Sequence, residues 1–288
     1  MKKTKYVYRN FYKDFFNSII KNPAFLISFF LLFSLFITGF MFNSFADTSK
    51  HLSINLDIAN IKPSSKYLFG TNSFGQNLLH LVLIGSYKTI LLAIISTLIN
   101  IILGIILGII WGSSTKFDSV MFFIKNFVDN TPLVLFYIII ALILGDGFVP
   151  LLLVIILFGW IEFAYIIRNY LIIIKSKDYN KVSQLYHVPL HKIAITNYLP
   201  AVLPLLFNNI ALCMPKIISL EIMISYFGFS FGSSSPSLGS IMYHSISNNT
   251  FFDNPHMFYI PFIFLLLINI CIYFSSKAIS NSFPKEGL

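Results

Sequence analysis

Six long apolar stretches, most of them without any charged residue, dominate this 288-residue sequence. The first covers residues 22–46 and the second covers residues 89–115. A helix needs about 20 mainly apolar residues to cross a hydrocarbon core about 30 Å thick. Only 11% of the residues are charged and 56% are hydrophobic, whereas soluble domains carry about 25% charged residues. The sequence therefore predicts an all-α integral membrane protein with one bundle of six transmembrane helices.

The charged and turn-forming residues between these stretches set the boundaries of the predicted helices. We predict spans at about 24–45, 86–112, 122–144, 148–168, 200–226 and 257–277. They lie in a transmembrane domain that covers residues 22–288, preceded by a basic N-terminal segment at 1–21. Residues 47–85 and 228–255 are rich in polar and turn-forming residues, and we expect extramembrane segments there.

Basic residues are distributed unequally between the two sides of the predicted membrane. With six spans both termini lie on one side, which carries 15 of the 20 Lys and Arg residues, while the other side carries four. An excess of Lys and Arg in short loops marks the cytoplasmic side. We therefore expect both termini and the passage 168–199 in the cytoplasm. The formal charge of +9 is then a topology signal and gives no reason to expect a nucleic-acid partner.

Three glycines in the second span have the spacing of a helix–helix contact. Gly104, Gly108 and Gly112 follow one another at intervals of four residues and so share one face of the helix. Without side chains on that face another helix can approach closely. Glycine is also common in membrane helices in general, which leaves ordinary usage as the alternative.

Three ionisable residues within the apolar stretches are candidates for a function, since such groups are rare in membrane spans and commonly functional there. Glu162 lies toward the cytoplasmic end of the fourth span, where it can reach the interface or meet Arg168. Lys216 and Glu221 lie in the fifth span, and their separation places them about 140° apart around a helix. We expect each of them to face a partner helix or a water-filled cavity, unless Glu221 is hydrated at the outer interface.

Motifs for covalent chemistry are absent from the sequence. It contains no phosphate-binding G-x-x-x-x-G-K-[ST] loop, no H-E-x-x-H zinc motif and no nucleophile elbow. His187 and His191 have the spacing of two metal ligands on a helix, but Pro189 between them disfavours one continuous helix. We predict a chain without catalytic residues, metal ligands or a cofactor of its own.

The passage 168–199 is the longest charged and turn-rich stretch between two apolar runs. Ser176 or Asp178 can cap a helix start. The apolar stripe that follows is made of Tyr179, Val182, Leu185 and Tyr186. A second short helix at 190–198 leads to the fifth span. An amphipathic helix between two spans has to bury its stripe against the bundle or in the groove of a partner.

This passage resembles the coupling loop, or EAA loop, of permeases of ABC importers, in particular the second permease of dipeptide, oligopeptide and nickel importers. Matches to the motifs of that family occur in family order from about residue 67 to 240. The matching positions are 70–77, Asp129, Pro132, Leu133, Gly159, Trp160, Ala164, Arg168, Leu171, Asp178, Tyr179, Leu199, Pro200, Pro204, Glu221, 225–228 and 237–239.

The resemblance implies the fold of a type I ABC importer permease and a set of partners. These are a second permease in a heterodimer that encloses the pore, two cytoplasmic ATPases that bind ATP and Mg²⁺, and an extracytoplasmic solute-binding protein. The residues implied in ATPase coupling are Asp178, Tyr179, Lys181, Val182, Ser183, Leu185 and His187. Peptides are the implied substrate, with nickel or another metal chelate as the alternative.

Several positions depart from the family pattern. Lys181-Val182-Ser183 stands where the family has E-A-A, and His187 stands where it has glycine. Asn72, Gln76 and Asn77 replace three charged residues of the outer segment. These departures suggest either a divergent subfamily with co-adapted partners or a transporter with weakened transport.

A stand-alone secondary transporter or channel is the rival interpretation from another class. It predicts an inverted repeat and charged residues near the midplane of the membrane that coordinate ions. No such repeat is visible in the sequence, and Lys216 and Glu221 are the only candidates for the charged residues.

Overall fold

The computed structural model describes residues 17–44, 53–145, 147–178, 180, 186, 188–229, 231, 236–247 and 252–282. Within these ranges the chain forms helices and turns, and the β pairing is limited to one isolated bridge between Thr71 and Asn77. Five helices are long and apolar enough to cross a membrane, and two shorter helices joined at a sharp bend make a sixth span if taken together. The prediction of an all-α membrane bundle is confirmed.

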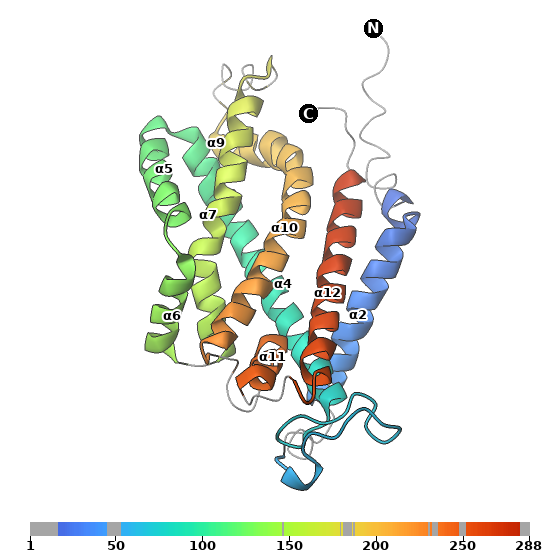
Figure 1. The fold of residues 1–288 in the computed structure, drawn as a ribbon. Helices are drawn as coiled ribbons and strands as arrows, with labels where there is room; N and C mark the ends of the chain where they lie inside the picture. Colours follow the sequence, from blue (N-terminus) through green and yellow to red (C-terminus); the bar gives the residue numbers. More distant parts are fainter. Residues whose placement is uncertain are drawn as a thin grey trace.

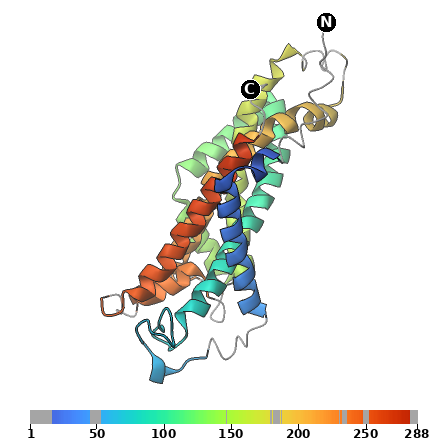
Figure 2. The same ribbon diagram turned by 90° about the vertical axis from the view of Figure 1, so that its right-hand side faces the viewer.

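Five long helices form the body of the bundle: α2 (Pro23–Ser44), α4 (Leu78–Ser113), α7 (Phe148–Lys175), α10 (Leu199–Tyr226) and α12 (His256–Asn281). Figures 1 and 2 show α4 running through the bundle with the other helices around it. The last residues of α4 and α7 lie at the same end of the bundle, which is at the top of Figure 1 and is called the upper end. The opposite end is called the lower end.

The third predicted span differs from the expectation of one helix at 122–144. It consists of α5 (Thr115–Asp129) and α6 (Leu133–Leu144), which meet at an angle of 90°. Pro132 lacks an N–H group and restricts the residue before it, so a straight helix cannot continue. The hydroxyl of Thr131 donates to the carbonyl of Phe127 at 2.6 Å, which satisfies one of the carbonyls that the break releases.

The three glycines of α4 lie directly against α7. A Cβ atom at Gly104 would be 2.5 Å from the Cβ of Phe163, and one at Gly108 would be 2.8 Å from the carbonyl oxygen of Ala164. At Gly112 the nearest atom would be a methyl of Leu171 at 3.0 Å. The two backbones therefore approach so closely that the first two positions have no room for a side chain.

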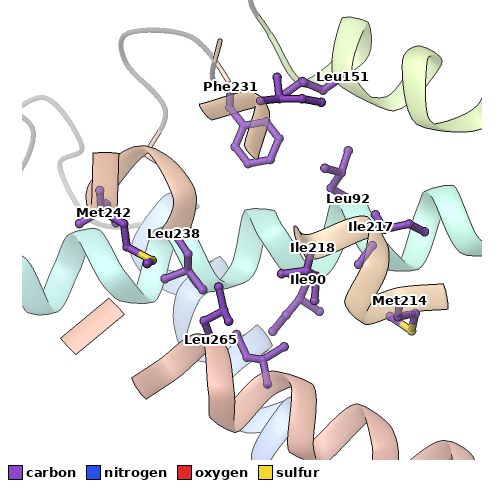
Figure 3. Packing of buried hydrophobic residues seen from close by; sticks show 14 of the residues in the cluster. Ile90, Leu92, Leu151, Met214, Ile217, Ile218, Phe231, Leu238, Met242 and Leu265 are labelled. Atoms are coloured by element: carbon purple, nitrogen blue, oxygen red, sulfur yellow. The ribbon is translucent and has the colours of Figure 1, made fainter. Parts of the chain in front are cut away.

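The main apolar core joins α4, α7, α10 and α12 in the lower half of the bundle. Figure 3 shows Leu92 of α4 close to Ile217 of α10, with Leu265 of α12 on the far side of the same cluster. Leu238 comes from α11 (Leu238–Ser247), a short helix that inserts its apolar side into this core.

Helix α11 lies in the stretch 228–255, which the sequence predicts to be a loop. Its start is fixed by a reciprocal pair of hydrogen bonds: the N–H of Ser240 donates to Ser237 Oγ at 3.0 Å, and the N–H of Ser237 donates to Ser240 Oγ at 2.8 Å. This is a capping-box arrangement, which satisfies two N–H groups at the helix start.

A compact polar segment, residues 53–77, lies below the membrane helices and contains one 3₁₀ turn, η2 (Leu56–Ile58). Asn72 organises it, since its Oδ1 accepts from the backbone N–H groups of Phe74 and Gln76 and its Nδ2 donates to Gln76 Oε1 at 2.9 Å. Asn77 caps α4 by accepting from the N–H of Leu79 at 3.0 Å. Neutral amides thus interact at positions where the resemblance implies charged residues.

Candidate functional site

The described part of the passage 168–199 is attached firmly to the upper end of α7. It contains α9 (Leu190–Ile193) and the π-helical turn η3 (Ala194–Tyr198), which leads without interruption into α10. Ile193 and Tyr198 are 4% and 1% exposed and pack in a cluster with Leu171 of α7. A π-helical turn inside a helical run commonly marks a functional position.

Asn180 is the polar anchor of this attachment. It is fully buried, and its Nδ2 donates to the carbonyl oxygen of Ile174 in the last turn of α7 at 2.8 Å. Its Oδ1 accepts from Asn197 Nδ2 in η3 at 2.7 Å. One side chain therefore connects the end of α7 with the start of the α10 run.

Most of the residues that the family resemblance assigns to ATPase coupling lie outside the described residues. These are Tyr179, Lys181, Val182, Ser183, Leu185 and His187. Asp178 is described and lies three residues after Lys175, the last residue of α7. The coupling role of all seven residues stays a prediction.

Asp118 connects α4, α5 and α7 at the upper end. Arg168 donates to both of its oxygens, from Nε at 2.7 Å and from Nη2 at 2.6 Å. Trp111 of α4, which is 1% exposed, donates its indole N–H to the same carboxylate at 2.7 Å. The guanidinium carbon of Arg168 also lies 4.7 Å from the centre of the Phe122 ring. A bidentate arginine–carboxylate pair fixes orientation as well as distance.

A cavity of about 720 Å³ lies between α5, α7 and α10 at the level of Glu162, near the middle of α7. Lys216 Nζ lies 2.7 Å from Glu162 Oε1 across this cavity. The expectation that Glu162 meets Arg168 is wrong, because Arg168 binds Asp118. The Lys216 and Glu162 side chains are 60% and 45% exposed in the single chain. Lys216 therefore faces both a neighbouring helix and open space, as expected of an ionisable group within a span.

A second ion pair and a buried amide complete the polar lining of this cavity. Lys125 and Asp129 of α5 are paired one helical turn apart, and Lys125 Nζ also lies 4.2 Å from the centre of the Tyr165 ring. Asn100 of α4 is 1% exposed, and its Oδ1 has no hydrogen-bond partner among the described residues. A Cβ at Gly159 would lie 2.2 Å from Asn100 Nδ2, so only glycine leaves room for this amide.

Glu221 of α10 packs against the first turn of α11 and does not lie at a hydrated surface, so the alternative of a wet outer interface is wrong. It is 0% exposed, and its Oε1 accepts from Ser225 Oγ at 3.2 Å. The side chains of Ser237 and Thr89 lie near it, and its Oε2 has no hydrogen-bond partner among the described residues. A Cβ at Gly239 would be 3.0 Å from Glu221 Oε1. A carboxylate at a helix N-terminus is favourably placed in the field of the helix dipole.

Sequence reasoning missed three of the residues that hold these sites together. Asn180 stands in the polar passage and has no distinguishing pattern, while Asn100 is a single amide in an apolar run. Asp118 carried a weak signal, because it is an acid in the first turn of a helix that follows Ser114, a residue suited to capping. Among the described residues, no three His, Cys, Asp or Glu side chains are grouped to hold a metal ion.

Comparison with known proteins gives consistent matches along most of the chain. Over 276 residues it is 27% identical to the oligopeptide transport system permease protein AmiD of Streptococcus pneumoniae, covering 95% of this chain and 89% of that protein. It is 27% identical to the dipeptide transport system permease protein DppC of Lactococcus lactis, covering 79% of this chain and 66% of that protein. With the oligopeptide transport system permease protein OppC of Salmonella typhimurium the identity is 29%, covering 77% and 74%.

A family model matches the segment that contains α5 to α12, together with about the last third of α4. The match covers residues 101–283, which include the passage 168–199, the four charged residues of the cavity, and Glu221. The resemblance to importer permeases that the motifs indicate is therefore confirmed. The chain belongs to the family of binding-protein-dependent transport system inner membrane components.

Proposed function

We propose that this chain is one of two permease subunits that enclose the pore of an ATP-driven importer of dipeptides or oligopeptides. The family match supports a permease, and relatives named as oligopeptide and dipeptide permeases support peptides as the substrate class. The chain contributes transmembrane helices and does no covalent chemistry. ATP and Mg²⁺ bind to separate ATPase subunits, and an extracytoplasmic binding protein delivers the substrate.

The upper end of the bundle faces the cytoplasm in this proposal. The excess of Lys and Arg residues on the predicted cytoplasmic side supports that orientation. The lower end, with the 53–77 segment and α11, then faces the binding protein. The second permease completes the pore beside this chain, since one bundle of six helices supplies only half of its wall.

The observation that carries the coupling role is the attachment of the passage to both α7 and α10. Asn180 hydrogen-bonds to the last turn of α7 and to η3, and Tyr198 is buried against α7. A helix at 176–189 that is docked in an ATPase groove would therefore move the upper ends of α7 and α10 together. Closure of the ATPases on ATP would change the pore between its inward-facing and outward-facing forms.

Purification of the tagged chain in mild detergent tests this proposal. We expect a second permease and two ATPase subunits to purify with it, and the complex to hydrolyse ATP. A chain that transports substrate alone, without any ATPase in the functional complex, would refute the importer role and favour a stand-alone transporter.

The apolar stripe of the coupling passage provides a sharper test. We expect Val182→Asp combined with Leu185→Asp to abolish ATP-dependent peptide uptake, because an apolar stripe that docks in a groove cannot bury two carboxylates. Insertion of the chain into the membrane should be unchanged, since these residues lie outside the spans. The conservative pair Val182→Ile and Leu185→Met serves as the control and should transport normally. Normal uptake by the aspartate variant would contradict the docking role.

A further inference from the structure

The charged cavity has a composition that the packing of helices does not require. Lys216 and Lys125 supply two positive charges, and Glu162 and Asp129 supply two negative charges. Charged groups at the depth of a membrane span are costly unless they face protein or water. The wall of one cavity thus carries two ion pairs, each of a positive and a negative group. This arrangement suits a ligand that carries both charges.

The Lys216–Glu162 pair is held loosely enough to exchange its partners. Both side chains are about half exposed in the single chain, and the pair joins two different helices at 2.7 Å. Exposed ion pairs contribute little net stability, so the pair can open at small cost when a ligand supplies equivalent charges. Asp129 lines the same cavity, which therefore holds a second acid besides Glu162.

Asn100 gives an independent sign of a ligand. Its side chain lines the cavity, is almost completely buried, and keeps Oδ1 without a hydrogen-bond partner among the described residues. Buried polar atoms are nearly always satisfied, so an unsatisfied acceptor calls for a missing donor. A peptide supplies such donors in its N–H and ammonium groups. The volume of about 720 Å³ lies within the range of small-ligand sites.

We propose that this cavity is a transit site for the two charged termini of a zwitterionic peptide. The α-carboxylate of the peptide binds Lys216, the α-ammonium group binds Glu162 or Asp129, and the peptide replaces the internal ion pair while it passes. The cavity is partly open in the single chain, and the second permease closes it. This site assignment rests on the proposed peptide import, whose failure the following experiment detects separately.

The test combines one substitution with one change in the peptide. ATP-dependent uptake of labelled tri-alanine and of tri-alanine C-terminal amide is measured in proteoliposomes that contain the whole importer and its binding protein. The chain is wild type or carries Lys216→Met. Because the binding protein is identical in both cases, its own preference for the carboxylate cancels in the ratio of wild-type to variant uptake.

We expect Lys216→Met to reduce uptake of the free-carboxylate peptide about tenfold, while uptake of the amide falls about twofold or less, since the amide offers no carboxylate to the lysine. Lys216→Arg should restore the preference for the carboxylate. Lys21→Met removes an exposed lysine that precedes α2 and does not line the cavity. It is the matched control, for which both peptides should keep their wild-type rates. Glu162→Gln with N-acetylated tri-alanine tests the ammonium end in the same way.

An equal loss for both peptides would overturn the transit site and assign the pair to helix packing. Failure of both Lys216→Met and Lys216→Gln to assemble with the other subunits would overturn it as well, since the lysine would then be needed for assembly. If the wild-type importer takes up neither peptide, the proposed function itself fails, which is a different result from either of these.

Discussion

Replacement of Gly108 by leucine is expected to prevent stable folding of this membrane bundle. A single Cβ at this position would already lie 2.8 Å from the carbonyl oxygen and 3.0 Å from the Cα of Ala164. Both are backbone atoms, so the clash cannot be relieved by a rotamer change and the two helices have to separate. Overpacking by about one methylene costs about 1–3 kcal/mol, and a whole leucine side chain will cost more.

The measurement is the amount and homogeneity of the fluorescently tagged protein on size-exclusion chromatography in mild detergent. We expect Gly108→Leu to give mainly aggregate, and Gly108→Ala to give a folded peak with a lower unfolding temperature. Ile106→Phe is the matched control, because Ile106 is on the same helix but is 53% exposed. A wild-type elution profile and unfolding temperature for Gly108→Leu would contradict a backbone-to-backbone contact between α4 and α7.

The second large effect is expected from Asp118→Ala. This change leaves Nε and Nη2 of Arg168, whose side chain is 14% exposed, and the indole N–H of Trp111 without their acceptor. An unsatisfied buried partner costs about 1–3 kcal/mol, and more when it is charged. We expect a clear fall in the unfolding temperature of the purified protein. Asp118→Asn should be intermediate, because it keeps one acceptor oxygen and loses the charge.

A double-mutant cycle distinguishes this pair from two independent contributions. Asp118→Leu combined with Arg168→Met removes both partners, so the double variant should be more stable than the sum of the two single changes predicts. Asp57→Ala, at an exposed position of the 53–77 segment, controls for the loss of a carboxylate and should leave the unfolding temperature unchanged. Strict additivity of the two single variants would show that Asp118 and Arg168 do not stabilise the fold as a pair.

The apolar stretches were sufficient to predict the membrane bundle, because the length of a span is fixed by the bilayer and needs no knowledge of tertiary contacts. The same argument fails for α11, whose Ser- and Gly-rich surroundings hide a helical pattern of buried residues. These are Leu238, Ile241, Met242 and Ser245. It also fails at Pro132, where the sequence marks a break but does not give the 90° angle.

The candidate sites were harder to predict because their partners are far apart in the sequence. The spacing of Gly104, Gly108 and Gly112 defines a face but not the helix that covers it, which the structure identifies as α7. Glu162 and Lys216 are 54 residues apart, and only the packing of α7 on α10 brings them together. Arg168 could pair with Glu162 on its own helix or with Asp118. Only the packing of α5 against α7 shows that it pairs with Asp118.

The close contact between α4 and α7 also has a mechanical consequence. Two helices whose backbones touch along three successive turns cannot slide past one another and behave as one stiff lever. With a rise of 1.5 Å per residue, the 36 residues of α4 extend about 54 Å. A tilt of about 5° around its upper end therefore displaces its lower end by about 5 Å. Because the last two turns of α7 belong to the passage 168–199, a small rotation imposed there would displace the 53–77 segment and α11 by more than the diameter of an atom.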